Sequence, residues 1–378
     1  MEIIAEMPVF GQSGWELLCR SLLLALDKLG VKIQLNPKME WNAEKCPLPD
    51  EDFSRLMRMT KYKANQSVAN AHLLHQAPSE EYLRTGWHND VVKVCISLFE
   101  TDRCPAPWIY KLNKMTETWV FSEFNRKGWE ESGVRNVGVM PFAIDTDLFN
   151  PNVIPIKPVG KKSYAFITNG DFTERKFFEG LVEAFITEFS NQDDVCLIFK
   201  SHFGGFTRQH KLDVVNRIRQ VVMRFNKGNP PRILLLGEKV PYESMPSFYT
   251  MGDCFVLISR GEGLGLPYAE ALACGVPVIA SNWGGHLQFL NESNSYLVGA
   301  TAHIIDDMEY IRKCMIALNH SWATPNVGSL RNLMRFVVML PELAKIKGLI
   351  GRKDMEKRDW QRVAIWIINR VLELQRKR

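Results

Sequence analysis

The sequence predicts an α/β protein with two domains, each built around a parallel β-sheet. Short apolar runs rich in Val, Ile and Phe recur along the chain, and longer stretches of helical period separate them, which is typical of parallel βαβ units. The length of 378 residues is too great for one ordinary hydrophobic core and suits two. Pro151, Pro155 and Pro158 crowd a segment that can continue neither a helix nor a central strand, so we place the linker there.

These observations set the expected domain limits. We predict an N-terminal domain over residues 1–152 and a C-terminal domain over residues 153–345. Residues 346–378 are expected to form a helix that packs back on the core, because apolar residues recur there at helical spacing. Basic residues such as Arg370 decorate the same helix and leave open a membrane-surface contact as the alternative. The apolar face consists of Trp360, Val363, Ala364, Ile367, Val371 and Leu374.

The first half opens with a short strand near Ile3, followed by a glycine-bearing loop. Ser13 and Glu16 then form a capping-box pattern that predicts the start of a helix. Gly30 stands where a helix-terminating glycine belongs. Further strands are expected, in order, over Val31–Leu35, Val91–Leu98, Thr118–Phe121 and Val137–Met140.

The second half repeats the alternation of strands and helices, and after about Ala302 the chain is expected to be mostly helical. The predicted strands are Tyr164–Thr168, Val195–Phe199, Arg232–Leu236, Cys254–Ser259 and Val276–Ala280. The predicted helices are Lys176–Phe189, Lys211–Phe225 and Leu266–Ala273.

The composition excludes several classes of protein. The net charge of +5 is small, so no nucleic-acid partner is expected. A few excess positive charges are compatible with a phosphate-bearing ligand. The 8 cysteines lie mostly in apolar runs without a CxxC pair, which argues against structural zinc and favours reduced thiols in the cytoplasm. The N-terminus lacks a signal-peptide pattern, and no apolar run approaches the roughly 20 residues that span a bilayer. We therefore expect a soluble or peripherally membrane-associated protein.

The most informative segment runs from Ser259 to Glu270 and reads SRGEGLGLPYAE. A buried strand enters three glycines, and Pro267 follows at the start of a helix, where proline is favoured. Glycines let a ligand approach the backbone, and the N–H groups of a helix N-terminus attract phosphate. The loop lacks GxGxxG spacing, and no GK[ST] follows, so it is neither a dinucleotide fingerprint nor a Walker loop.

Two carboxylates accompany this loop. Glu262 stands within it, and Glu270 lies a little over one turn into the following helix. A carboxylate so near a phosphate site repels the phosphate unless it meets another part of the ligand. A ribose diol is an obvious candidate, because a carboxylate can accept hydrogen bonds from both hydroxyls.

Glu262 and Glu270, with seven residues between them, resemble the E-x7-E motif of the retaining GT-B glycosyltransferases, the glycogen-synthase-like group. The adjoining EALACGVPVIAS resembles that family's EAMACGxPVIA stretch. VPYESMPSFYTMGDCFVLIS, GVMPFAIDTDLFNP and TWVFSEFNRKGWEESGV are also similar to family segments, so the resemblance covers about residues 90–300. It implies the GT-B fold, with two Rossmann-like domains facing each other across a cleft.

The resemblance also implies roles for residues of the donor site. Glu270 would bind the ribose of the nucleotide, and Glu262 would touch the transferred sugar. The backbone N–H groups of Gly263, Leu264 and Gly265 would meet the sugar or the phosphate.

Two further parts of the donor site are expected. Base specificity is expected to rest on backbone contacts near Val240 and Tyr242. By analogy with the family, the loop that ends at Gly14 would face the diphosphate from the other domain.

The family also places an Arg and a Lys on the diphosphate. Lys176 aligns with the expected lysine, but the usual Gly-Arg pair is replaced by Gly170-Asp171. Arg175 is expected to take over the role of that arginine, with Lys200 as a weaker third cation. Paired cations of this kind neutralise charge that develops on a leaving diphosphate, so we expect no metal to be needed.

The N-terminal domain is expected to contribute a catalytic side chain. Many relatives place a His at the end of a buried strand, but the equivalent run here, VVKVCISLFE, ends at Glu100. Glu100 is our first candidate for that position and His75 the second. Asp145 and Asp147 superficially match the DxD metal motif, but their context predicts a turn. His286 is expected to be structural.

The predicted activity is transfer of a sugar from a nucleoside-diphosphate sugar to a hydroxyl acceptor with retention of configuration. The acceptor would be a glycan, polysaccharide or glycoconjugate. The missing His and Gly-Arg pair leave a catalytically inactive sugar-nucleotide-binding or scaffold protein as the alternative. A Rossmann oxidoreductase is disfavoured, because no early GxGxxG is present. The residue types do not encode the base, the sugar or the oligomeric state.

Overall fold

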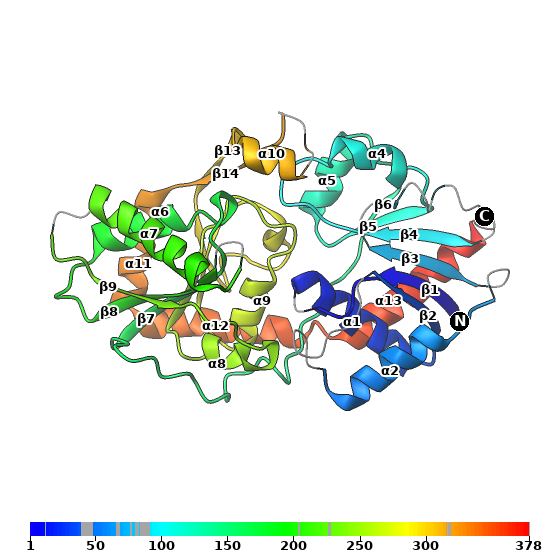
Figure 1. The fold of residues 1–378 in the computed structure, drawn as a ribbon, viewed down its shortest axis with the longest axis horizontal. Helices are drawn as coiled ribbons and strands as arrows, with labels where there is room; N and C mark the ends of the chain where they lie inside the picture. The colour runs from blue at the N-terminus through cyan, green and yellow to red at the C-terminus, as the bar shows by residue number, and fades with distance from the viewer. Residues whose placement is uncertain are drawn as a thin grey trace. The chain divides into compact units, whose positions relative to one another are not determined.

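The protein consists of two compact units, seen in a computed structural model (Figure 1). Unit 1 combines Met1–Ala143, Met308–His320 and Arg358–Arg378, and unit 2 combines Ile144–Asp307 and Ser321–Lys357. The structure describes residues 1–11, 13–38, 48–65, 69–75, 78–79, 83, 91–202, 205–225, 228–314, 316 and 319–377.

Unit 1 contains a six-stranded parallel sheet in the order β2-β1-β3-β4-β5-β6. Helices α1 and α13 pack on each other, and Figure 1 shows α13, in red, alongside α1. The strands are β1 (Glu2–Met7), β2 (Lys32–Pro37), β3 (Ala71–His75), β4 (Val92–Ile96), β5 (Glu117–Val120) and β6 (Val137–Val139). The helices are α1 (Gly14–Lys28), α2 (Asp50–Lys61), α4 (Ala106–Leu112), α5 (Glu123–Glu131), α10 (Met308–Cys314) and α13 (Trp360–Arg376).

Unit 2 contains a second parallel sheet of six strands, in the order β12-β11-β10-β7-β8-β9, and a separate antiparallel hairpin of β13 and β14. The strands are β7 (Tyr164–Asp171), β8 (Val195–His202), β9 (Arg232–Leu236), β10 (Cys254–Leu257), β11 (Val278–Ser281), β12 (Tyr296–Val298), β13 (Ala300–Ile304) and β14 (Ser321–Pro325). The α-helices are α6 (Phe178–Glu188), α7 (Arg208–Phe225), α8 (Met245–Tyr249), α9 (Leu266–Ala273), α11 (Val327–Met339) and α12 (Pro341–Glu356). Short 3₁₀ helices are η1 (Glu174–Lys176), η2 (Tyr242–Ser244) and η3 (Gly285–Gln288).

The predicted start and end of the first helix are confirmed. Glu16 N donates to Ser13 Oγ at 3.4 Å, and Ser13 N donates to Glu16 Oε2 at 2.7 Å, which completes the capping box. Gly30 follows the helix with φ +79°, a left-handed conformation that glycine adopts without steric cost. The helix thus begins and ends where its local sequence signals place it.

Two features differ from the sequence expectations. Strand β3 was not predicted, although it lies between β1 and β4 within the sheet of unit 1. The segment after Ala302, expected to be mostly helical, contains the β13–β14 hairpin before the helices α11 to α13. Most side chains of β13 are exposed, so no alternation of apolar and polar residues marks it as a strand.

The boundaries of the two units also differ from the expected limits. The chain first passes from unit 1 to unit 2 between Ala143 and Ile144. The three prolines of the predicted linker therefore lie inside unit 2. The segment expected as one C-terminal element, residues 346–378, is divided: α12 belongs to unit 2 and α13 to unit 1. A contact explains why α12 belongs to unit 2. Arg352 on this helix donates hydrogen bonds to backbone carbonyls of Thr146 and Phe149, near the start of that unit.

We expect Arg352→Met to destabilise unit 2 by about 3 kcal/mol, since it leaves several carbonyl groups without their donor. Nη1 of Arg352 donates to the carbonyl oxygens of Thr146, Phe149 and Ala273 at 3.0, 2.7 and 2.8 Å. The urea midpoint of unfolding measures the loss. Lys353→Met, at an exposed position of the same helix, is the matched control and should leave the midpoint nearly unchanged.

Helix α13 buries most of the predicted apolar face within unit 1. Arg370 pairs with Glu117 of β5 and strengthens this attachment. The face considered for a membrane contact is therefore packed against protein. Among the described residues, no helix is both long and apolar enough to cross a membrane. The buried residues of the face are Val363, Ala364, Ile367, Val371 and Leu374.

Candidate functional site

The glycine loop of unit 2 joins β10 to α9 and requires glycine for steric reasons. Gly265 has φ +81°, and a Cβ there would lie 2.7 Å from the ring of Tyr268 and 2.9 Å from Cβ of His286. A Cβ on Gly285 would lie 1.9 Å from the carbonyl oxygen of Gly263. Two loops thus meet backbone to backbone at the start of α9.

Three charged side chains meet at this loop. Nζ of Lys176 donates to Oε1 of Glu262 at 2.6 Å, and Nη1 of Arg175 lies 3.2 Å from the same oxygen. Burial acts to raise the pKa of Glu262, but the charges of Lys176 and Arg175 outweigh it and lower the pKa to about 2. Glu262 therefore stays ionised at any physiological pH, and two cations face a single carboxylate oxygen.

Backbone contacts hold the two cations in place. They belong to η1, between β7 and α6, and the carbonyl oxygen of Arg175 accepts the N–H of Arg260 at 2.7 Å. Nη1 of Arg175 donates to the carbonyl oxygen of Gly261 at 2.6 Å. Phe177, which follows Lys176, has φ +52°, a left-handed backbone conformation that is rare for a bulky residue. The turn and the glycine loop therefore form one connected structure.

The second carboxylate, Glu270, lies in a separate buried network. Oη of Tyr249 donates to Oε2 of Glu270 at 2.5 Å, and Nδ2 of Asn169 donates to Oη of Tyr249 at 2.8 Å. Burial raises the pKa of Glu270 to about 7, although the hydrogen bond from Tyr249 and the charge of Lys200 both act to lower it. Burial lowers the pKa of Lys200, and the charge of Glu270 opposes that shift.

Sequence reasoning missed Tyr249 and Asn169. Tyr249 comes from the short helix α8, where it reads as an ordinary core residue, and Asn169 lies on β7. Only the packing of distant segments brings Tyr249 to the carboxyl of Glu270 and Asn169 to the hydroxyl of Tyr249.

The remaining predicted residues of unit 2 lie in the glycine loop or in and just before η2. Leu264 is buried in the glycine loop, and Val240 precedes η2. The ring of Tyr242, the first residue of η2, packs edge-to-face on Phe149 at 5.3 Å.

Three predicted residues belong to unit 1. Gly14 is the first residue of α1, and Glu100 is half-buried in the loop after β4. His75 ends β3 and packs on the ring of Trp15 at 4.2 Å. Burial, together with the charge of Lys38, lowers the pKa of His75 to about 3, so its imidazole is neutral at pH 7.

The structure supports the structural interpretation of the remaining motifs. His286 is buried, and its Nε2 lies 2.7 Å from the carbonyl oxygen of Ser281. Oδ1 of Asp145 accepts the backbone N–H groups of Asp147 and Leu148 at 3.1 and 2.9 Å, as in a turn. Within the described ranges, no group of three or more His, Cys, Asp and Glu side chains is placed to hold a metal ion. Independence of a metal stays a prediction.

Comparison with known proteins points to one family. Residues 164–314 match the family model described as Glycosyl transferases group 1. The chain is 36% identical over 74 residues to the GDP-mannose-dependent alpha-(1-6)-phosphatidylinositol monomannoside mannosyltransferase of Mycolicibacterium smegmatis, which is 18% of each chain. It is 51% identical over 43 residues to the O-antigen chain mannosyltransferase B of Escherichia coli, 11% of each chain. The matched segments thus span less than a fifth of these relatives.

Solved structures match over the whole chain. Sucrose-phosphate synthase from Thermosynechococcus elongatus has a TM-score of 0.66 at 18% identity and full coverage of both chains. Anabaena Alr3699/HepE, in complex with UDP and glucose, has a TM-score of 0.67 at 14% identity, covering 99% of this chain and 100% of that one. At these identities the likeness concerns the fold, and it confirms the predicted α/β class of two Rossmann-like domains.

Proposed function

We propose, from the premise that residues 164–314 form a glycosyl transferases group 1 domain within a GT-B fold, that this protein is a sugar-nucleotide-dependent glycosyltransferase. It would transfer a sugar from a nucleoside-diphosphate donor to a hydroxyl of a glycan, polysaccharide or glycoconjugate, with retention of configuration. The observation that carries the proposal is the cluster of half-buried Arg175 with buried Lys176 and Glu262 at the glycine loop. Action in the cytoplasm and without a metal belongs to the same proposal.

The two cations are suited to a diphosphate. Lys176 and Arg175 lie 2.6 and 3.2 Å from one oxygen of Glu262, so one anionic group already contacts both. A donor diphosphate would compete for these cations and leave the carboxylate of Glu262 to the sugar hydroxyls. As the bond to the sugar breaks, the cations would stabilise the charge that develops on the leaving diphosphate. The acceptor hydroxyl would attack from the same face, with the leaving phosphate taking its proton.

The glycine loop supplies neutral donors beside these cations. Gly263, Leu264 and Gly265 directly precede α9, whose N-terminus carries a partial positive charge. The absence of side chains on the glycines allows a phosphate or sugar to approach the backbone. Gly14, at the start of α1, is proposed to present its N–H to the diphosphate in the same way.

Glu270 is the proposed ribose ligand. Its carboxyl orientation is fixed before the donor binds, because Tyr249 holds Oε2. Lys200 offsets part of the negative charge. Backbone groups near Val240 and Tyr242 are proposed to contact the base.

Glu100 is the proposed catalytic contribution of unit 1. It is half-buried, so its carboxyl has access to a ligand. His75 is buried against Trp15 and has a pKa of about 3, which suits a packing role better than proton transfer.

One observation keeps the catalytically inactive binding or scaffold protein as a second candidate. Asp171 stands where the family pattern has an arginine, and its Oδ1 lies 3.3 Å from Nδ1 of His202. This side chain therefore offers no positive charge to a diphosphate. Transfer, or slow hydrolysis of the donor by purified protein, excludes the inactive alternative.

A thermal-shift screen with UDP, GDP, ADP and their common sugar conjugates tests the donor. A ligand present at 100 times its Kd stabilises the folded protein by about 2.7 kcal/mol, so we expect one nucleotide class to raise the melting temperature. Glu270→Ala should lose this shift, whereas Lys162→Ala, just before β7 and beside Asp194, should retain it. If no nucleotide stabilises the folded wild type, the donor proposal fails.

A further inference from the structure

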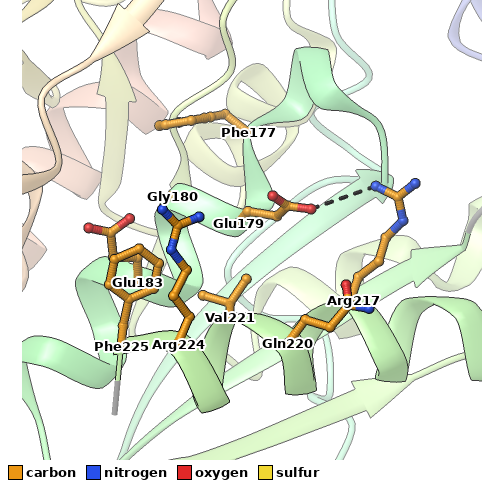
Figure 2. A pocket seen from close by; sticks show the side chains of 9 residues that line it. All are labelled: Phe177, Glu179, Gly180, Glu183, Arg217, Gln220, Val221, Arg224 and Phe225. Carbon is orange, nitrogen blue, oxygen red and sulfur yellow. Dashed lines mark ion pairs between the residues drawn. The ribbon is translucent and has the colours of Figure 1, made fainter. Parts of the chain in front are cut away.

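A groove of about 330 Å³ lies between the start of α6 and the last turns of α7 (Figure 2). Its volume is at the lower end of the range for small-molecule sites. The rings of Phe177 and Phe225 and the side chain of Val221 provide its apolar surface. Its polar side chains are Glu179, Glu183, Arg217, Gln220 and Arg224.

The polar side chains balance in charge. Nη1 of Arg217 lies 3.6 Å from Oε1 of Glu179, as the dashed line in Figure 2 marks. Burial raises the pKa of Glu183, and the charge of Arg224 opposes it. Two carboxylates and two guanidinium groups therefore line one groove. A strongly anionic or cationic ligand would meet charge of its own sign there, so a neutral ligand fits best.

The chemistry of the lining narrows the ligand further. Carboxylates, guanidinium groups and an amide are planar groups with paired hydrogen-bond acceptors or donors. Such groups can bond two adjacent hydroxyls of a ligand at once. Aromatic rings provide flat apolar surface for the C–H face of a ring compound. A neutral, hydroxyl-rich ring with one apolar face is a saccharide unit.

The wall formed by Phe177 is held in a fixed position. Its left-handed backbone, φ +52°, is strained for a bulky residue and persists only where contacts enforce it. The ring covers Gly180, where a Cβ would lie 2.3 Å from Cε1 of the ring, and the guanidinium group of Arg260 lies 4.5 Å from the ring centroid. Glycine at position 180 and arginine at position 260 thus allow the ring to lie in this orientation.

We propose that this groove is a second saccharide-binding site, distinct from the cluster of Lys176, Arg175 and Glu262. The apolar face of the sugar packs on Phe177 and Phe225, and its hydroxyls bond to Glu183, Arg217 and Gln220. A free monosaccharide and a unit of a glycan chain present the same chemistry to the groove. The site goes beyond the proposed transfer activity, and its argument does not depend on that activity.

Saturation-transfer NMR with methyl α-mannoside, and separately with linear mannotriose, tests the site in the whole protein without donor. We expect saturation transfer to the ring protons of at least one probe in wild type. In Arg217→Ala and Phe225→Ala the Kd should rise about tenfold, since each change removes a charged hydrogen bond or an aromatic wall. Equal affinity for both probes indicates a free sugar as ligand, and tighter binding of mannotriose indicates a glycan chain.

Controls separate this groove from the rest of the protein. Arg219→Ala, at an exposed residue of the same helix outside the groove, should bind both probes like wild type. If Arg217→Ala melts too early to be studied, Gln220→Ala at an exposed residue serves in its place.

Three results overturn the proposal: no transfer to either probe, equal binding in wild type and the folded groove variants, or displacement of the probe by a mixture of UDP, GDP and ADP. No turnover is measured, so a failure here is distinguishable from a failure of the transferase proposal.

Discussion

Replacing Lys176 with methionine is expected to lower kcat by about 10²–10³-fold, the loss typical when one preorganised donor to a developing charge is removed. Lys176 is the nearer of the two cations to Glu262, at 2.6 Å against 3.2 Å for Arg175. Methionine keeps most of the length of the lysine side chain and removes the charge. The rate at saturating donor and acceptor measures the effect on the chemical step.

The same change also affects folding, because it leaves Glu262 buried with one cation fewer. Breaking a buried ion pair from one side costs about 3–5 kcal/mol. The double variant Lys176→Met/Glu262→Gln removes the uncompensated charge, so we expect it to recover much of the melting temperature. Its kcat should stay low, which separates the loss of chemistry from a loss of folded protein.

Two further variants complete the test. Lys176→Arg keeps the positive charge and should retain more activity than Lys176→Met. Lys162→Met removes a lysine just before β7, at the end of that strand opposite to η1, where it lies 3.7 Å from Asp194. The kcat of this variant should be near that of wild type. A Lys176→Met enzyme that turns over within a few-fold of wild type would show that this lysine does not meet the diphosphate.

Much of the proposed donor site was predictable because its signal is local. Glu262 and Glu270 lie in one strand–loop–helix segment, and Pro267 at the first turn marks where the helix begins. The predicted helix Leu266–Ala273 coincides with α9. Lys176 was placed by the family resemblance; the helix expected to begin there is instead divided into η1, which ends at Lys176, and α6, which begins two residues later.

The other features of the site and the fold could not be predicted from the sequence, because they depend on contacts between distant segments. Tyr249 reaches Glu270 across 21 residues of sequence, and nothing near Tyr249 distinguishes it from a core aromatic residue. Residues 308–320 belong to unit 1, whereas β13 and β14 on either side of them belong to unit 2. No local sequence pattern indicates that the chain returns to unit 1 over these residues. Strand β3 reads AHLLH, and its two histidines obscure a fully buried strand.

The affinity for a nucleoside-diphosphate sugar is expected to fall about tenfold for each pH unit below about 7 and to level off above it. Burial raises the pKa of Glu270 to about 7, so the carboxylate that would accept both ribose hydroxyls under the proposed function predominates only above that pH. Glu262, with a pKa of about 2, does not titrate in this range. The phosphates of a sugar nucleotide are diesters and stay ionised throughout.

Tyr249→Phe should move the midpoint of this profile to higher pH, because the hydrogen bond from Tyr249 acts to lower the pKa of Glu270. Glu270→Gln should flatten the profile, because the amide does not titrate. Tyr164→Phe, at the other end of β7 from Asn169, removes a hydroxyl from the same unit and should leave the midpoint in place. Calorimetric titration at a series of pH values measures all four proteins. A wild-type affinity that is constant from pH 6 to 8, with the same value in Glu270→Gln, would remove Glu270 from the ribose site, since no ionisation would then be linked to binding.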